Sequence, residues 1–405
     1  MSTTRVEALF PVADRVSHYN YAIRNIVAEA RPLEAAGRRI RYLNVGDPVA
    51  FGFQPPAHMV AAVEQALRDG HHGYGPSVGI ASAREAVARE LSTRGFPTSP
   101  ERVVVSAGTS EAIDLALSAL VNAGDEVLVP MPTYSLYTAV LSRLDVHARF
   151  YRTDEANGWM PDLDHLRSLI TPATRVLVVI DPNNPTGAIY TPAIRRRLLE
   201  LAIEHHLVVL ADEVYGDLGY DGPVPPIGSL MPDAPVISCS SLSKGYLAPG
   251  WRTGWLAISR HHQLDPVLAA IQKLADGRLC STLPMQYAVA AALNGDRSHQ
   301  ASFRTALRAR AELTARRLNA IDGITCVPPA AAFYAMPRVA LPPGRTDADY
   351  VLGLLRATGV LTVYGSGFGT NPADGFLRIV FLAQPAELDE VCDAIAGFTR
   401  DYLNR

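Results

Sequence analysis

Residues 238–255 read SCSSLSKGYLAPGWRTGW. The three residues before them, 235–237, are apolar and typical of a buried strand. The turn after this predicted strand brings together hydroxyls, an amine and a guanidinium: Ser241, Ser243, Lys244 and Arg252. Most lysines are solvated surface charges, so Lys244 alone fits an ordinary loop. Lysine also forms Schiff bases, however, and hydroxyls with an arginine suit a phosphate group. The combination leads to the hypothesis of a pyridoxal 5′-phosphate site.

The composition indicates a globular chain and gives no sign of a nucleic-acid or membrane partner. Of 405 residues, 48% are hydrophobic and 19% are charged, and the net charge is −3 without a basic block. The cysteines are far apart and form no CxxC pair, which argues against a zinc site or disulfides: Cys239, Cys280, Cys326 and Cys392. Residues 1–16 are too polar for a signal peptide, and no apolar run has transmembrane length. We therefore expect a cytoplasmic protein without a metal site.

The middle of the chain alternates short apolar runs with helical patterns. This alternation predicts an α/β fold with a mostly parallel sheet that helices cover on both faces. The predicted strands are 102–106, 126–130, 175–180, 207–211 and 235–240. After a helix-rich stretch, short strand-like pieces alternate with helices, as in a smaller α+β domain. We expect a large domain at 46–290, a small C-terminal domain at 291–405, and an N-terminal segment, 1–45, packed with the small domain.

Polar residues follow several of these predicted strands, at the ends where such sheets bind ligands. SAGTSEA, residues 106–112, suits a phosphate at a helix N-terminus, although a simple helix cap has the same pattern. Asp212 ends a buried strand, and it is either an N-cap or the partner of a protonated ring nitrogen. DPNNPTG, residues 181–187, fits a β-turn or a rigidly held asparagine. Tyr134 suits the core or stacking on a flat ring equally well.

The joint order of these pieces resembles the class I and II aminotransferases of the pyridoxal phosphate fold-type I superfamily. The matching stretches are YLNVGDP (42–48), YGPSVG (74–79), SAGTSEA (106–112), PMPTY (130–134), DPNNPTG (181–187), ADEVY (211–215), SLSKGYLAPGWRTGW (241–255), AAFYAMPR (331–338), GSGFG (365–369) and LRIVFL (377–382). The resemblance covers roughly residues 20–400 and is closest to the alanine aminotransferase-like branch. It implies a large domain with a mixed, mostly parallel sheet between helices, and a smaller α+β domain.

Carried over residue by residue, the resemblance implies a complete cofactor site. Lys244 forms the internal aldimine and then moves the proton between the substrate Cα and the cofactor's C4′. Asp212 pairs with the pyridine nitrogen, and Tyr134 stacks on the ring; these are the three catalytic residues. Asn184 and Tyr215 hold the ring hydroxyl oxygen. The phosphate is bound by the remaining predicted cofactor residues: Gly108, Thr109, Ser110, Ser241, Ser243 and Arg252.

The resemblance also implies how substrates and subunits are arranged. Arg378 forks onto the substrate α-carboxylate, beside Asn184 and Gly46, which lets the backbone come close to the substrate. Tyr74 reaches the phosphate of a neighbouring subunit, so the resemblance implies a homodimer with shared sites. The implied reaction is ping-pong transamination between an L-amino acid and a 2-oxo acid, with alanine, glutamate, pyruvate and 2-oxoglutarate as default substrates.

Two alternatives keep the same scaffold. One is another pyridoxal phosphate reaction, such as β-elimination or a specialised biosynthetic step on an unusual amino acid. The other is a non-catalytic amino-acid sensor, which the lack of a basic helix-turn-helix segment disfavours. Three positions depart from the family pattern: Asp181 replaces a frequent asparagine, Ala331 a glycine, and Tyr364 a proline or histidine. The last two bear on the substrate pocket.

Overall fold

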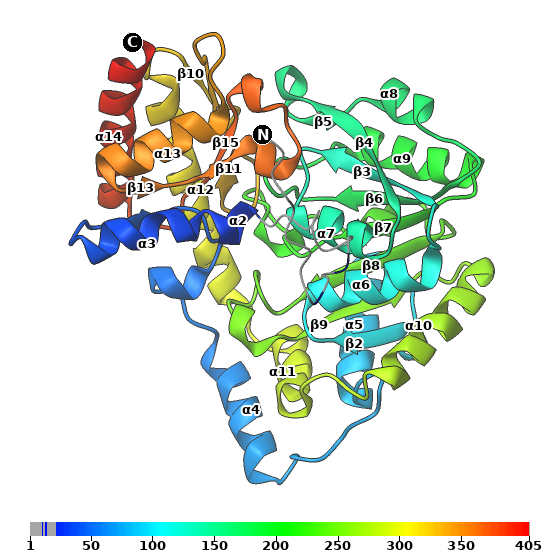
Figure 1. Cartoon of the computed structure of the whole chain (residues 1–405). Coiled ribbons are helices and arrows are strands. Elements are labelled where there is room, and N and C mark those ends of the chain that lie inside the picture. The colour runs from blue at the N-terminus through cyan, green and yellow to red at the C-terminus, as the bar shows by residue number, and fades with distance from the viewer. Residues whose placement is uncertain (1–9, 11–12, 14–21, 405) are drawn as a thin grey trace.

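Figure 1 shows the computed structural model, in which a broad twisted sheet lies beside a smaller group of helices and short strands. The structure describes Phe10, Ala13 and residues 22–404. Residues 1–9, 11–12 and 14–21 of the predicted N-terminal segment lie outside the described residues.

The large sheet runs, within the described residues, in the order β2-β9-β8-β7-β6-β3-β4-β5. Its strands are β2 (Val103–Ser106), β3 (Glu126–Met131), β4 (His147–Asp154), β5 (Met160–Pro161), β6 (Thr174–Ile180), β7 (Val208–Asp212), β8 (Val236–Ser241) and β9 (Gly254–Ile258). The pairs from β4 through β3, β6 and β7 to β8 are parallel, whereas β9 and β5 pair antiparallel with their neighbours. The predicted α/β class with a mixed, mostly parallel sheet is confirmed.

The central strands are apolar almost throughout because helices cover both faces of the sheet. In β2, Val103 and Val105 pack toward one face and Val104 toward the other, as the two-residue period of a strand requires. One face packs on α4 (Ala57–Arg68), α5 (Ala81–Thr93), α8 (Leu163–Ser168), α9 (Pro192–Glu204) and α11 (Leu283–Asn294). The other packs on α6 (Thr109–Leu120), α7 (Ser135–Arg143) and α10 (Asp265–Gly277).

The smaller part of the molecule surrounds a separate hydrophobic cluster. Its helices are α2 (Ala22–Asn25), α3 (Val27–Ala35), α12 (Ser298–Asn319), α13 (Asp347–Thr358) and α14 (Pro385–Leu403). Its strands are β1 (Arg41–Tyr42), β10 (Ile324–Thr325), β11 (Tyr334–Ala335), β12 (Arg338–Val339), β13 (Val360–Leu361), β14 (Val363–Tyr364) and β15 (Leu377–Val380). β1 pairs in parallel with β13, so the chain returns near its C-terminus to the segment that precedes the large sheet. In Figure 1 this part lies to one side of the sheet.

The strand order explains where a ligand can bind. From β3 the chain moves outward to β4 on one side, and later strands, β6 to β8, lie on the other side of β3. The connections therefore diverge between β3 and β6, which opens a crevice at the carboxyl ends of these strands. The predicted site residues that follow the strands come together at this edge.

Candidate active site

A cavity of ≈ 560 Å³ lies at the carboxyl ends of β3, β6, β7 and β8. It brings together most of the predicted site residues: Gly46, Thr109, Ser110, Tyr134, Asn184, Asp212, Tyr215, Ser241, Ser243, Lys244, Arg252 and Arg378. Gly108 lies beside the wall, under the Arg252 guanidinium. Tyr74 is 84% exposed and does not line the cavity of its own chain. Ala331 and Tyr364 do not line it either, and their bearing on the substrate pocket stays a prediction.

Lys244 stands on the cavity wall, three residues after β8 ends. Its Nζ donates to the carbonyl of Gly46 at 2.7 Å. Burial lowers the pKa of the Lys244 amine to about 8, Asp47 opposes this shift, and the cations Arg378 and Arg252 add to it. A substantial share of the amine is therefore neutral near pH 8, as a nucleophile and proton acceptor needs.

Asp212 is the last residue of β7 and is 3% exposed. Burial raises the pKa of its carboxyl to about 6. Hydrogen bonds from the Val214 amide at 3.4 Å and the Tyr137 hydroxyl at 3.3 Å lower that pKa and favour the charged form. A buried carboxylate on a cavity wall is costly unless it meets a cation. A protonated ring nitrogen would supply one.

The turn between β2 and α6 has the form of a phosphate cradle. Gly108 precedes α6 with φ +88°, and a Cβ there would lie 2.4 Å from Arg252 Nη2, so a glycine is required. Arg252 donates to the carbonyls of Ala107 and Pro249, both at 3.0 Å, which holds its guanidinium over the helix N-terminus. The free amide groups at that terminus and the guanidinium together favour an anion.

One observation tests whether these residues fit pyridoxal phosphate. The Thr109 hydroxyl is buried at the cavity and has no hydrogen-bond partner within the described part of the chain. Buried hydroxyls without partners are rare in folded proteins, so a ligand oxygen at this point would satisfy it. The residues present fit the phosphate of the cofactor, and Lys244 and Asp212 line the same cavity.

Arg378 enters the cavity from β15 and is 1% exposed. Its Nη1 donates to Asn184 Oδ1 at 3.1 Å and its Nη2 to the carbonyl of Asn44 at 2.5 Å. The guanidinium carbon lies 4.6 Å and 4.7 Å from the ring centroids of Tyr334 and Phe368. This arrangement fixes the plane of the guanidinium, which prepares it for a carboxylate.

Tyr334 contacts both Arg378, the predicted substrate residue, and Tyr215, a predicted cofactor residue. Its hydroxyl lies 2.8 Å from that of Tyr215, and its ring packs on Arg378. A Cβ on Gly46 would lie 2.3 Å from the Tyr334 hydroxyl, so the backbone approaches this ring as closely as a glycine allows.

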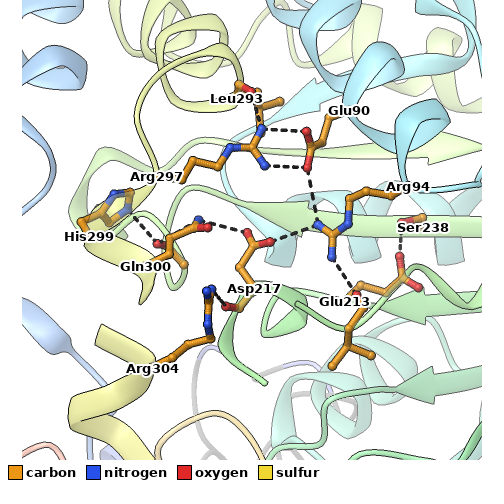
Figure 2. A network of polar contacts seen from close by, with 12 residues as sticks. Glu90, Arg94, Glu213, Asp217, Ser238, Leu293, Arg297, His299, Gln300 and Arg304 are labelled. Carbon is orange, nitrogen blue, oxygen red and sulfur yellow. Dashed lines mark hydrogen bonds and ion pairs between the residues drawn. The ribbon is translucent and has the colours of Figure 1, made fainter. Parts of the chain in front are cut away.

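A polar network between α5 and α12 reaches the carbonyl of Gly245, the residue after Lys244 (Figure 2). Gln300 Nε2 donates to the Gly245 carbonyl at 3.3 Å and to Asp217 Oδ2 at 3.4 Å. Arg94 Nη1 donates to Asp217 Oδ1 at 3.0 Å, and Arg297 forms a bidentate pair with Glu90 at 2.7 Å. The network joins α5, the 213–217 loop and α12.

Sequence reasoning missed four polar residues around the cavity: Arg24, Asp47, Tyr137 and Tyr334. Asp47 follows Gly46 in a quoted stretch, so its place beside Lys244 could have been considered. Tyr334 stands in the AAFYAMPR stretch, where nothing marks it apart from neighbouring core aromatics. Tyr137 follows Tyr134 by three residues, one helical turn, and that spacing was its only signal.

Comparisons with known proteins cover nearly the whole chain. Residues 40–395 match the family described as "Aminotransferase class I and II". The chain is 36% identical to the glutamate-pyruvate aminotransferase AlaA of Haemophilus influenzae, over 97% of this chain and 99% of that protein. It is 39% identical to an alanine aminotransferase of Mycobacterium bovis, over 94% of this chain and 91% of that protein. The solved alanine aminotransferase of Pyrococcus furiosus superimposes with a TM-score of 0.94 at 38% identity, covering 96% of this chain and 100% of that one.

Proposed function

This chain belongs to the class I and II aminotransferases, which are pyridoxal phosphate enzymes. We propose that it transfers the amino group of L-alanine to 2-oxoglutarate, which yields pyruvate and L-glutamate, and that it catalyses the reverse reaction. The observation that carries this choice is that two guanidiniums besides the Arg252 of the phosphate cradle line the cavity that holds Lys244. Arg378 suits the α-carboxylate that all these substrates share, and Arg24 of α2 offers a second cation at the same cavity. Alanine needs the first alone, whereas the distal carboxylate of glutamate needs the second.

The roles of the residues follow from their places in the cavity. Pyridoxal phosphate, when bound, supplies an electron sink for the bonds at the substrate Cα. Arg378 holds the α-carboxylate and so keeps the Cα within the cavity that contains Lys244. With its pKa lowered toward 8, Lys244 is the proposed base that takes the Cα proton and returns it later. Asp212, as a buried anion, is the proposed partner that keeps the ring nitrogen protonated.

We also propose a homodimer in which Tyr74 completes the partner's phosphate site. Tyr74 and Leu279 are large side chains that are 84% and 54% exposed. The Gly75 amide bonds to Cys280 Sγ at 3.4 Å, so both side chains belong to one surface region. Tyr74→Phe should weaken the affinity of the apoprotein for pyridoxal phosphate, while the protein still sediments as a dimer. A monomer at micromolar concentration would contradict the assembly.

No helix in the described residues is long and apolar enough to cross a membrane. The cytoplasmic location expected from the sequence stays a prediction.

A half-reaction screen tests the proposed substrates. The cofactor-loaded enzyme is mixed with each amino acid singly, and the visible absorbance is followed as it converts to that of the pyridoxamine form. Alanine and glutamate should convert it, and pyruvate or 2-oxoglutarate should reverse the change. Conversion by neither, with turnover of another amine or release of ammonia and pyruvate, would contradict the proposal and favour another pyridoxal phosphate reaction.

Arg24 gives this proposal a second test. Arg24→Gln should raise KM for glutamate and 2-oxoglutarate about tenfold or more, because a charged hydrogen bond contributes about 1.5–3 kcal/mol. KM for alanine and pyruvate should stay within about twofold, since neither carries a second carboxylate. Steady-state kinetics with both pairs measures the difference, and equal losses for both pairs would remove Arg24 from side-chain selection.

A further inference from the structure

Tyr137 is a fully buried side chain that contacts Asp212, a residue of the cavity wall, without lining the cavity itself. It lies in α7 and is 0% exposed. Its hydroxyl donates to Asp212 Oδ2 at 3.3 Å. The other oxygen, Asp212 Oδ1, accepts from the Val214 amide at 3.4 Å. Each oxygen of this carboxylate therefore has a donor from the protein itself.

A fully buried tyrosine hydroxyl has to be compensated energetically. A phenylalanine fills nearly the same volume, and burying a hydroxyl is unfavourable unless it forms a hydrogen bond. Burial, the Asp212 charge and Cys239 hold the pKa of the Tyr137 phenol well above its usual range, so it stays a donor. Its bond to the Asp212 carboxylate is the compensation that keeps a hydroxyl in the core.

The other groups near Asp212 have mixed effects on its charge. Burial and Glu213 raise the pKa of Asp212, whereas Lys244, the Val214 amide and the Tyr137 hydroxyl lower it. Cys239 and Tyr215 also lie close and stay protonated because burial raises the pKa of each. Once a lysine amine loses its charge to react, it no longer favours the Asp212 anion. The Tyr137 hydroxyl and the Val214 amide then remain as donors.

We propose that Tyr137 is a positioning residue: it holds Asp212 in the ionised form and in the orientation that the ring nitrogen of the cofactor requires. The inference rests on the role proposed for Asp212. It does not depend on which amino acid is the substrate, because its readout is cofactor affinity.

The test measures pyridoxal phosphate affinity of the apoprotein by titration between pH 6 and 9. Tyr137→Phe should weaken affinity about tenfold, the effect of losing one hydrogen bond to a charged group. The loss should grow toward pH 6, because the Asp212 carboxyl protonates more readily without its donor. Tyr151→Phe is the matched control: Tyr151, in strand β4, is as fully buried as Tyr137, but its hydroxyl donates to the Val178 carbonyl at 2.9 Å, away from the cavity.

A double-mutant cycle separates positioning from general packing. In an Asp212→Ala background, Tyr137→Phe should cause no further loss of cofactor affinity, because the carboxylate that accepts the Tyr137 hydrogen bond is absent. In the half-reaction of the loaded enzyme, Tyr137→Phe should lower the maximal rate and leave the amino-acid KM within about twofold. Where Tyr137→Phe does not fold, Tyr137→Met removes the same donor with a side chain that adapts to the space.

The outcomes are separable. Weakened affinity that is specific to position 137, depends on pH and vanishes in the Asp212→Ala background supports the proposal. Wild-type affinity at every pH, a loss equal to that of Tyr151→Phe, or an undiminished loss in the Asp212→Ala background overturns it. If alanine and glutamate fail in the half-reaction screen while the affinity results stand, only the proposed substrates are wrong.

Discussion

Burial displaces the pKa values of Lys244 and Asp212 toward each other, with the amine falling to about 8 and the carboxyl rising to about 6. Both shifts have the same first cause, because a low dielectric disfavours either charge. The pair is thus prepared for two different tasks near neutral pH. A neutral amine accepts a proton, and a carboxylate that has lost water gains most from a cationic partner.

The lowered Lys244 pKa predicts how the apoprotein captures its cofactor. The reactive form is the neutral amine, so the capture rate should rise with pH up to about 8 and then level off. An ordinary lysine, with a pKa of about 10.4, would keep gaining rate to pH 10. Stopped-flow absorbance at constant ionic strength measures the profile. A rate that still rises tenfold between pH 9 and 10 would show that Lys244 is not desolvated.

The raised Asp212 pKa predicts a stability effect in the apoprotein. The folded state retains this proton up to pH about 6, whereas the unfolded chain loses it near 4, so the folded state binds more protons in between. The contribution of Asp212 to stability therefore falls as pH rises from about 4 to 6. In urea titrations, Asp212→Asn should flatten the pH dependence of unfolding in this window. An identical dependence in both proteins would refute the shift.

Arg378 predicts a loss that every substrate shares. Arg378→Lys keeps the charge but loses the planar fork that Tyr334 and Phe368 hold in place. Its kcat/KM should fall about 30-fold or more for each amino acid tested, through KM, because truncating a buried charge partner costs about 2–5 kcal/mol. An effect confined to glutamate would instead make Arg378 a side-chain reader.

Residue types at strand ends allowed much of the site to be predicted. Residues whose place at the site depends on how helices pack on the sheet could not be predicted. Asn184, Asp212 and Lys244 follow predicted strands, where polar residues stand out against apolar runs. Tyr137 lies on the apolar face of a helix, where a tyrosine is usually a core residue. Its role depends on which strand α7 packs against, and no local pattern contains that information.

At the scale of elements, α12 connects the small part of the molecule to the turn after β8 that contains Lys244 and Gly245. Gln300, 3% exposed, bonds to the carbonyl of Gly245, directly after Lys244. The helix-rich stretch was predicted, but its contact with the turn was not, because the two are far apart in sequence. Strand β9, GWLAI, was also missed, because it directly follows a loop dominated by Arg252.

Gln300→Leu tests this connection. It removes the Gln300 donor from Asp217 Oδ2 and one of two side-chain contacts at the Gly245 carbonyl, which His299 Nε2 also contacts at 3.2 Å, so the free energy of unfolding should fall by about 1–3 kcal/mol. The loaded enzyme should also show a shifted visible absorbance, because the backbone beside Lys244 is less constrained. Ser302→Ala, on an exposed turn of the same helix, is the control. Equal behaviour of the two variants would mean that α12 does not hold the turn.

At the scale of the whole molecule, the cavity draws on both parts of the fold. The sheet supplies Asp212 and Lys244, and the smaller part supplies Arg378 and Arg24. Separate segments of one chain therefore have to meet before the site exists, which is why a strand-by-strand reading finds the cofactor residues more readily than the substrate residues. The domain boundaries at 45 and 290 stay predictions.

The identity of the lysine that binds the cofactor tests the central claim most directly. The sequence has lysine at positions 244 and 273 and nowhere else, and Lys273 is exposed on α10. The cofactor-loaded protein is reduced with borohydride, which makes a lysine–cofactor bond permanent, and is then digested and mapped by mass spectrometry. The label should lie on Lys244, persist in Lys273→Ala and be absent from Lys244→Ala together with the visible absorbance. A label on Lys273, or an unchanged absorbance in Lys244→Ala, would contradict the account.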